Sequence, residues 1–347
     1  MKEGEAHMND HDRTSPESPD AEHDPGAQEA PSSSEAQGMN IAARTQWQLV
    51  RGRFFRHKAA LLGMFLLLGV VLLAFTSVGI GPLPGWWDKS PMATGPLHEG
   101  GRPTLSLVPE FLGGAGLALG EHPFGQDNVG KDYFALTMRG AQVSLIIAFL
   151  VGIVATIVAT VIGACAGYFR GWTETVLMRI TDVLIAIPLL AIAAAAAKIA
   201  GQAGIFYLGI VLGLVTWTQT ARLVRSAVLS LREKEFVEAA RSVGTSSVRI
   251  IFKHILPNTV GVIIVSVTLA IAAAVLLESA LSFLNMGVQP PDTSLGRLIT
   301  DYRSAMGTRP WLFYWPGLFI ILIALSVNFI GDGLRDAFDP RQNRVRD

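Results

Sequence analysis

The sequence predicts an all-α, polytopic membrane protein with six transmembrane helices. Half of its 347 residues are hydrophobic and only 16% are charged, a balance too apolar for an ordinary soluble domain. Six apolar segments are also long enough to cross a hydrocarbon core of about 30 Å as helices. The predicted spans cover residues 59–80, 143–168, 176–197, 205–221, 260–283 and 312–330. The fourth is short and ends in several polar residues.

Lys and Arg residues are distributed unevenly around these spans. They flank the first span at 51–58, crowd the segment between the fourth and fifth at 222–253, and follow the last at 335–346. Loops rich in Lys and Arg stay on the cytoplasmic side of a membrane, and an even number of spans returns the chain to the side where it began. Both termini and the 222–253 segment are therefore predicted to be cytoplasmic.

The segment at 232–257 is polar and helix-forming, although it lies between long apolar runs. Gly244 follows a stretch with helical periodicity, where glycine readily adopts the left-handed conformation that ends a helix. The Ser and Thr residues after it can act as the N-cap of a second helix, and Pro257 is expected to end that helix. The apolar faces of these two short helices are predicted to hold Phe236, Ala239, Ala240 and Val243 in the first, and Val248, Ile251 and Ile255 in the second.

The same segment resembles the EAA loop of the permease subunits of ATP-binding-cassette (ABC) importers. The Glu-Ala-Ala at 238–240 and Gly244 match that motif residue by residue. Residues 254–257 read His-Ile-Leu-Pro, where His replaces the Ile of the wider family and is similar to the peptide-permease branch. In that family the loop docks into a cleft on the ATPase subunit. The resemblance therefore implies that the ATPase-coupling residues are Glu238, Ala239, Ala240, Gly244 and Pro257.

A second motif lies before the second span. Residues 122–132 resemble the peptide-permease pattern His-Pro-x-Gly-Thr-Asp-x-x-Gly-Arg-Asp, with departures at Gln126 and Lys131. The resemblance extends over most of the chain from His122 to Pro340. The chain is thus similar to the C-type permease subunit of dipeptide and oligopeptide importers, a branch that also includes nickel and glutathione importers.

This resemblance implies a type I ABC importer permease fold with a MetI-like core, surrounded by lipid in the bacterial inner (plasma) membrane. It implies three kinds of protein partner: a B-type permease, two cytoplasmic ATPase domains that hold ATP and Mg, and an extracytoplasmic substrate-binding protein. The chain itself would carry no cofactor and no catalytic residue, and would form half of a translocation pathway. Peptides are the expected substrates, with nickel, glutathione or another small solute as the alternative.

The chain divides into five predicted parts. These are a disordered cytoplasmic tail at 1–40, a juxtamembrane segment with the first transmembrane helix at 41–80, an extracytoplasmic loop at 81–133, a five-helix permease core at 134–335 with its cytoplasmic coupling loop at 232–257, and a cytoplasmic C-terminal tail at 336–347. The first tail holds ten acidic residues against two basic ones and few large apolar side chains, too few to offset the entropy of ordering it. The extracytoplasmic loop is either a plain surface loop or a contact surface for the binding protein.

Three charged residues fall within the apolar spans. Arg179 and Asp182 are three residues apart, so they share a helix face and can pair. They would be either a structural pair near the cytoplasmic interface or part of the path and its coupling loop. Glu278 lies toward the outer end of the fifth span. It would either line the cavity or bond a neighbouring helix, since charged groups at membrane depth face a bundle interior or water.

Other functions find less support in the sequence. Gly125, Gly130 and Lys131 have the spacing of a phosphate loop, but Asp132 stands where a nucleotide site needs Ser or Thr for magnesium. The net charge is zero, which gives no indication of a nucleic-acid partner. A secondary transporter would show an internal repeat and ionisable groups at mid-membrane. A membrane-embedded enzyme would need a nucleophile–base pair or a metal-ligand cluster, and neither is expected here.

Overall fold

The computed structural model describes residues 46–106, 116, 118–200 and 203–339. The predicted tail at 1–40 and residues 340–347 of the predicted C-terminal tail lie outside these described residues. Within them, regular structure is helical apart from isolated β-bridges, which confirms the all-α prediction. The helices are α2 (Gln46–Phe54), α3 (Lys58–Ser77), η1 (Glu99–Gly101), α4 (Tyr133–Phe169), α5 (Gly171–Ala186), α6 (Leu189–Ala200), α7 (Ile205–Thr216), α8 (Thr218–Arg232), α9 (Glu235–Ser242), α10 (Ser247–Ile250), η4 (Ile251–Ile255), α11 (Leu256–Phe283), α12 (Leu295–Tyr302), η5 (Arg303–Ala305) and α13 (Trp311–Phe338).

Four helical runs in the described residues are long and apolar enough to cross a membrane. They are α3, α4, the continuous run Ser247–Phe283 and α13, and they correspond to the first, second, fifth and sixth predicted spans. α4 is longer than its predicted span because Asp132 caps it ten residues earlier: the Asp132 side chain accepts a hydrogen bond from the Ala135 N–H. The fold therefore contains the core of the predicted bundle.

The third predicted span is not one straight helix. α5 and α6 meet at an angle of 91°, and α5 ends at Ala186, with Ile187 in an extended conformation (ψ 132°). The cause is Pro188, because a proline disfavours helical geometry at the residue before it. Counted as one broken span, the pair raises the number of candidate spans in the described residues to five.

The fourth predicted span is also divided. α7 has 12 residues and ends at Thr216, and the chain then turns through Trp217 into α8. α8 buries one face, with Val224 and Val228 fully covered, and exposes Arg222 on the other. The apolar part of this span is therefore α7, while its polar end belongs to an amphipathic helix that continues to Arg232.

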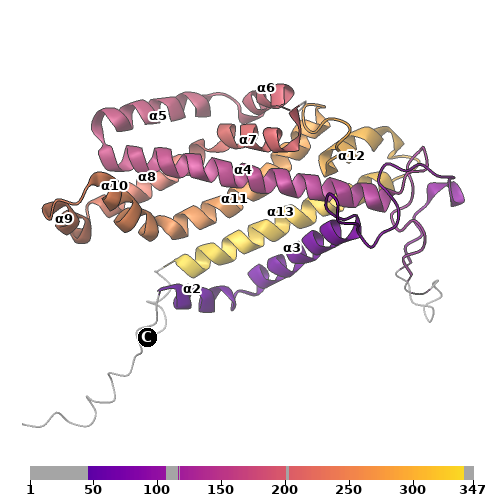
Figure 1. The fold of residues 1–347 in the computed structure, drawn as a ribbon, viewed down its shortest axis with the longest axis horizontal. Coiled ribbons are helices and arrows are strands. Elements are labelled where there is room, and N and C mark those ends of the chain that lie inside the picture. The colour runs from indigo at the N-terminus through magenta and orange to yellow at the C-terminus, as the bar shows by residue number, and fades with distance from the viewer. Residues whose placement is uncertain (1–45, 107–115, 117, 201–202, 340–347) are drawn as a thin grey trace, which may run out of the picture. The chain divides into compact units, whose positions relative to one another are not determined.

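α4 lies in the middle of the bundle and packs against α7, α8 and α11, while α3 packs against α13 (Figure 1). Small residues allow these close approaches, as is usual between membrane helices. A Cβ added at Gly163 of α4 would lie 2.6 Å from the Ala221 carbonyl oxygen of α8. The main core surrounds α4 and includes the fully buried side chains of Tyr133, Met138 and Leu212.

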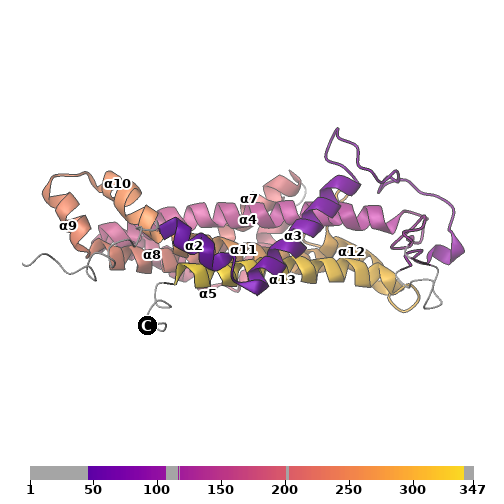
Figure 2. The same cartoon turned by 90° about the horizontal axis from the view of Figure 1, so that it is seen from below.

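The two ends of α4 meet different structures (Figures 1 and 2). Its first residue follows a long irregular segment, 78–132, whose described parts contain turns, bridges and the short helix η1. Its last turns pack against α8 and, with it, against the compact helical segment 233–255. These two regions at opposite ends of α4 contain most of the residues that the sequence analysis singled out.

Candidate functional site

The segment 233–255 forms a helix, a turn and a second helix, as the sequence predicts. Gly244 has a φ of +78°. Its N–H donates to the Arg241 carbonyl (3.0 Å), and the Thr245 N–H donates to the Ala240 carbonyl (3.1 Å). This pair of hydrogen bonds around a left-handed glycine is the Schellman motif that ends many helices, so the turn is fixed by the backbone of α9 itself.

The inner face of this segment is held by an apolar cluster. Val237 of α9 and Ile250 of α10 are fully buried. They pack with the buried residues of the adjacent helices, which are Ala164 and Tyr168 of α4, Val224 and Val228 of α8, and Ile251 and Ile255 of η4. The guanidinium of Arg232 also lies 5.9 Å above the Tyr168 ring, within the range of a cation–π contact. The segment is thus attached rigidly to the bundle.

The outer face of the same segment carries large apolar side chains that nothing in the described chain covers. The exposed fractions are 41% for Phe236, 80% for Val243, 62% for Val248 and 65% for Phe252. Glu238, Ala239 and Gly244 are exposed beside them. We call the surface of Phe236, Glu238, Ala239, Val243, Gly244, Val248 and Phe252 the outer face. The sequence predicts that Val248 shares a face with Ile251 and Ile255. Val248 lines the same groove beside α4 as Ile251, but it is exposed, whereas Ile251 and Ile255 are buried in the cluster.

Pro257 does not end the second helix. The helical run continues from Ser247 to Phe283, through a π turn at η4 in which the Leu256 N–H donates to the Ile251 carbonyl five residues back. A proline inside a helix lacks a donor and crowds the preceding turn, and a wider turn relieves that crowding. Asn258 also satisfies a backbone group here, since its Nδ2 donates to the His254 carbonyl at 2.7 Å.

Arg179 and Asp182 do not pair with each other. The Asp182 carboxylate instead accepts a hydrogen bond from the Arg222 guanidinium of α8 at 2.5 Å. A second pair joins the same two helices, between Glu174 of α5 and Arg225 of α8, where Nε donates at 2.9 Å. The sequence spacing favoured an ion pair within one helix. Because α5 lies beside α8, however, Asp182 finds its partner, Arg222, on α8.

Glu278 connects three helices at the other end of the bundle. Its carboxylate is 1% exposed and accepts hydrogen bonds from Ser144 Oγ of α4 (3.1 Å) and Ser282 Oγ of α11 (2.7 Å). Ser144 Oγ in turn accepts from the Leu295 N–H at the start of α12 (3.1 Å). Of the two roles considered for this residue, the geometry corresponds to bonding a neighbouring helix.

The residues with the spacing of a phosphate loop, 125–132, form a turn whose polar groups bond to each other and to Tyr302. Asp127 Oδ1 accepts from the N–H groups of Val129 (2.9 Å) and Lys131 (2.7 Å), and Tyr302 donates its hydroxyl to Asp127 Oδ2 at 2.8 Å. Burial, with the adjacent Asp127 charge, raises the pKa of Tyr302, so this phenol stays protonated as the donor. Asp132 occupies the helix N-terminus where a phosphate would have to lie.

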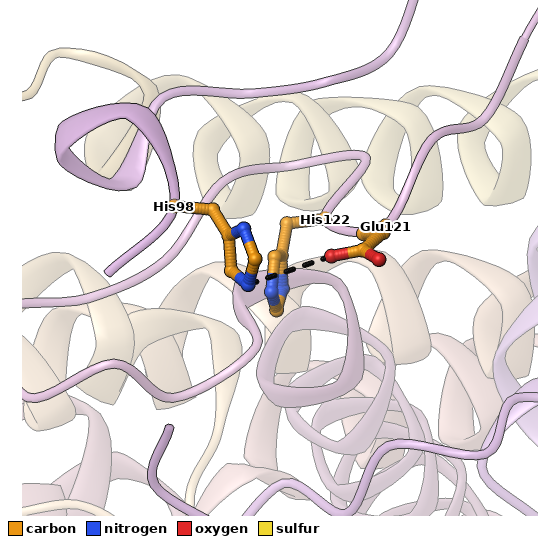
Figure 3. A group of neighbouring side chains, drawn as sticks. All are labelled: His98, Glu121 and His122. Carbon is orange, nitrogen blue, oxygen red and sulfur yellow. Dashed lines mark ion pairs between the residues drawn. The ribbon is translucent and has the colours of Figure 1, made fainter. Parts of the chain in front are cut away.

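In the described part of the 78–132 segment, three side chains that could bind a metal ion lie together, and the sequence alone gives no sign of this group. The imidazoles of His98 and His122 and the carboxylate of Glu121 converge so that one nitrogen or oxygen of each lies within 4.8 Å of the others (Figure 3). His98 Nε2 is 3.5 Å from the nearer Glu121 oxygen. His98 is more than twenty residues from the other two, so no local spacing pattern connects them.

Family models and curated relatives that are similar to this chain describe transport permeases. Residues 157–344 match the family described as binding-protein-dependent transport system inner membrane component, and residues 45–87 match the N-terminal TM domain of oligopeptide transport permease C. The oligopeptide transport system permease protein OppC of Haemophilus influenzae is 35% identical over 303 residues, which cover 87% of this chain and 91% of that protein. OppC of Mycobacterium tuberculosis H37Rv is 41% identical over 227 residues, covering 65% and 78%.

A solved structure has a similar fold. The inward-facing MetNI methionine ABC transporter contains a chain that aligns with a TM-score of 0.50 and 17% sequence identity, covering 59% of this chain and 97% of the other. At that identity the likeness concerns the fold alone.

Proposed function

Since the chain belongs to the family of binding-protein-dependent transport system inner membrane components, we propose that it forms one half of the translocation pathway of an ATP-driven importer of dipeptides and oligopeptides. The second half is a B-type permease. Two ATPase domains bind ATP and Mg on the cytoplasmic side, and an extracytoplasmic binding protein delivers the substrate. The peptide substrate is supported by relatives that are named as oligopeptide permeases at 35% and 41% identity.

The single observation that carries the coupling role is the construction of the segment 233–255. Its inner face is buried in the bundle, whereas Phe236, Val243, Val248 and Phe252 of its outer face stay exposed. An exposed apolar patch on a rigid support is typical of a protein interaction site. The small residues Ala239 and Gly244 lie within this patch and allow a partner's backbone to approach closely. An ATPase cleft is the partner that we assign to it.

In this mechanism ATP binding closes the ATPase dimer and draws the outer faces of the two permease subunits together. The run Ser247–Phe283 then carries the movement of the outer face into the membrane, because it is continuous with α10. The pathway opens outward, receives substrate and reopens inward after hydrolysis. Such a cycle is a two-state equilibrium that a ligand biases at a distant site.

The proposed orientation places α9, α10 and both termini in the cytoplasm, and the 81–133 loop outside. The chain carries one cysteine, so a Cys165→Ser background allows single new cysteines to be labelled. We expect Ser246→Cys to react with an impermeant thiol reagent only from the cytoplasmic side, and Gly100→Cys only from outside. Labelling of both from the same side would contradict this orientation.

The coupling role is tested with two variants of the outer face. Gly244→Val forces a β-branched residue into the left-handed region, at roughly 1–3 kcal/mol of local strain, with no steric clash because no atom lies within 4 Å of the added Cβ. Glu238→Arg reverses one exposed charge. We expect both variants to insert and to pair with the second permease, but to lose ATP hydrolysis stimulated by loaded binding protein in liposomes.

A matched control separates strain from position. Gly100 also has a positive φ (+71°) and open space around it, but it lies at the opposite end of the bundle, so Gly100→Val should keep full stimulation. Glu99→Arg serves the same purpose for the charge reversal. Full stimulation in both outer-face variants, with assembly verified by size exclusion, would mean that this segment does not couple the ATPase to transport.

A further inference from the structure

We propose that His98, Glu121 and His122 form a binding site for a divalent transition metal of the zinc class, which fastens the 78–132 segment to the start of α4. Nitrogen and carboxylate ligands in a set of three are typical of zinc sites that keep a fourth position open. The site is defined by side chains of this chain alone. It therefore does not depend on the proposed transport function.

The spacing of the three side chains suits one small ion. Zinc bonds to His nitrogen and carboxylate oxygen are about 2.0–2.2 Å, so two donors in a tetrahedral site lie roughly 3.4 Å apart. His98 Nε2 and the Glu121 carboxylate are already 3.5 Å apart. His122 completes the group, with its donor atom within 4.8 Å of the other two, and the imidazoles of His98 and His122 lie side by side with their centroids 5.6 Å apart (Figure 3).

A second observation concerns the orientation of His122. Its Nδ1 lies 2.7 Å from Oδ2 of Asp132, and both side chains are almost fully buried. With the carboxylate on Nδ1, Nε2 is the nitrogen that keeps a free lone pair for a metal ion. A carboxylate on the far nitrogen of a metal-binding histidine is the usual way in which such a ligand is oriented and made more basic.

A third observation shows that the position already attracts a cation. The Lys89 ammonium lies 3.2 Å from His122 Nε2 and 2.6 Å from the Glu121 carbonyl oxygen. Nε2 accepts a hydrogen bond from this ammonium because Nδ1 faces Asp132. A metal ion would bind Nε2 in place of the ammonium, so Lys89 acts as a built-in competitor for the site.

Metal binding would join parts of the chain that are now joined mainly by hydrogen bonds. His98 stands next to η1, Glu121 and His122 lie in the irregular stretch before Gly125, and Asp132 caps α4. An ion bound to all three ligands would hold these parts in one arrangement. The expected consequence is a higher unfolding temperature in the presence of zinc.

The test is a zinc titration of the full-length chain in detergent, freed of any histidine tag, followed by calorimetry and by thermal unfolding. We expect one ion per chain and an increase in unfolding temperature. His98→Ala and Glu121→Gln should each weaken binding by at least about tenfold. Both side chains are more than half exposed (52% and 68%), so these changes leave the fold intact, which circular dichroism verifies.

The most specific variant is Lys89→Met, which removes the ammonium and keeps the length of the side chain. It should tighten zinc binding several-fold, a direction that an adventitious surface site would not give. His254→Ala and Glu99→Gln remove a histidine and a carboxylate outside the cluster and should change nothing. Absence of stoichiometric zinc binding, unchanged affinity in the two ligand variants, or no tightening with Lys89→Met would each overturn the proposal.

Discussion

The segments at the two ends of α4 differ in which side chains they bury and which they expose. At the first end, the 78–132 segment directs its polar groups inward: Asp132 alone accepts from Trp87 Nε1 (3.1 Å) and the Ala135 N–H (2.7 Å) and contacts His122 (2.7 Å). At the second end, α9 and α10 direct apolar groups outward, with Val243 at 80% exposure.

The difference separates buried polar groups, which stabilise the chain itself, from exposed apolar groups, which are available to a partner. Buried polar groups with partners stabilise a structure by themselves, and an unpaired one is destabilising. Large exposed apolar groups gain nothing until another surface covers them. The described part of the 78–132 segment also exposes apolar side chains, such as Leu83 and Met92, but its buried polar groups hold it to the start of α4. The outer face has no such polar network and offers mainly apolar surface to a partner. Changes at the first end should lower stability, whereas changes on the outer face should lower affinity for a partner.

The largest effect is expected from Asp132→Ala. This change removes the N-cap of α4 and leaves the Trp87 and His122 nitrogens without an acceptor, which together should lower the free energy of unfolding by about 2–4 kcal/mol. Thermal unfolding of the purified chain measures it. Asp301→Ala is the control, because it removes an i,i+4 ion pair with Arg297 in which the Asp301 side chain is 40% exposed. An equal loss of stability in both variants would contradict the comparison.

Val237→Ala tests the inner face of the coupling segment. Val237 is fully buried against α8 and α10, so truncation should lower stability by about 1–3 kcal/mol through lost burial and a cavity. The same unfolding measurement applies. Ala substitution at exposed Val243, one turn and a half further along, should leave stability unchanged, and this contrast is the sharpest comparison of the two faces.

Phe236→Ala tests the outer face. Phe236 is 41% exposed, so its truncation should change the unfolding temperature little but weaken binding of the ATPase subunits about tenfold, or about 1.4 kcal/mol. Surface plasmon resonance with the purified ATPase measures this affinity. The control is Phe65→Ala, which changes an exposed residue of α3 away from the segment and should not affect the affinity. Unaltered ATPase affinity in Phe236→Ala would show that the outer face is not the contact surface.

The smallest effect is expected from the pair of Asp182 and Arg222. Their side chains are 47% and 43% exposed, and ion pairs of this kind contribute about 0.2–1 kcal/mol. A double-mutant cycle with Asp182→Asn and Arg222→Gln, measured by thermal unfolding in low and high salt, should give a coupling energy in that range that decreases with salt. A coupling above this range would mean that the pair is a principal link between α5 and α8.

Local patterns predicted the parts of the fold that depend on a few neighbouring residues. The left-handed turn at Gly244 follows from glycine chemistry, and the spans of α3, α4 and α13 follow from apolar length. The 91° break also had a visible cause in Pro188, but the apolar run around it concealed the break. Hydropathy averages over a window, whereas a backbone bend depends on one residue.

Features that depend on distant residues could not be predicted in the same way. The partner of Asp182 lies forty residues along the chain, and the ligand group joins His98 to residues 121 and 122. The choice of role for Glu278 required knowing that Ser144 of α4 faces it. Sequence spacing gives the face of a helix, but only packing decides which helix lies opposite that face.

The π turn at Ile251–Ile255 sets the helical phase between the outer face and the membrane. Each residue added to an α-helix rotates everything beyond it by about 100°, whereas a π turn accommodates one extra residue within a wider turn. Deleting one residue from the α-helical part of the run, beyond this turn, would rotate α9 and α10 around the axis of α11 by that angle. Ile250 would then leave its cluster, and Phe252 would point in a new direction. The direction in which the outer face points therefore depends on the number of residues between it and the membrane part of the run.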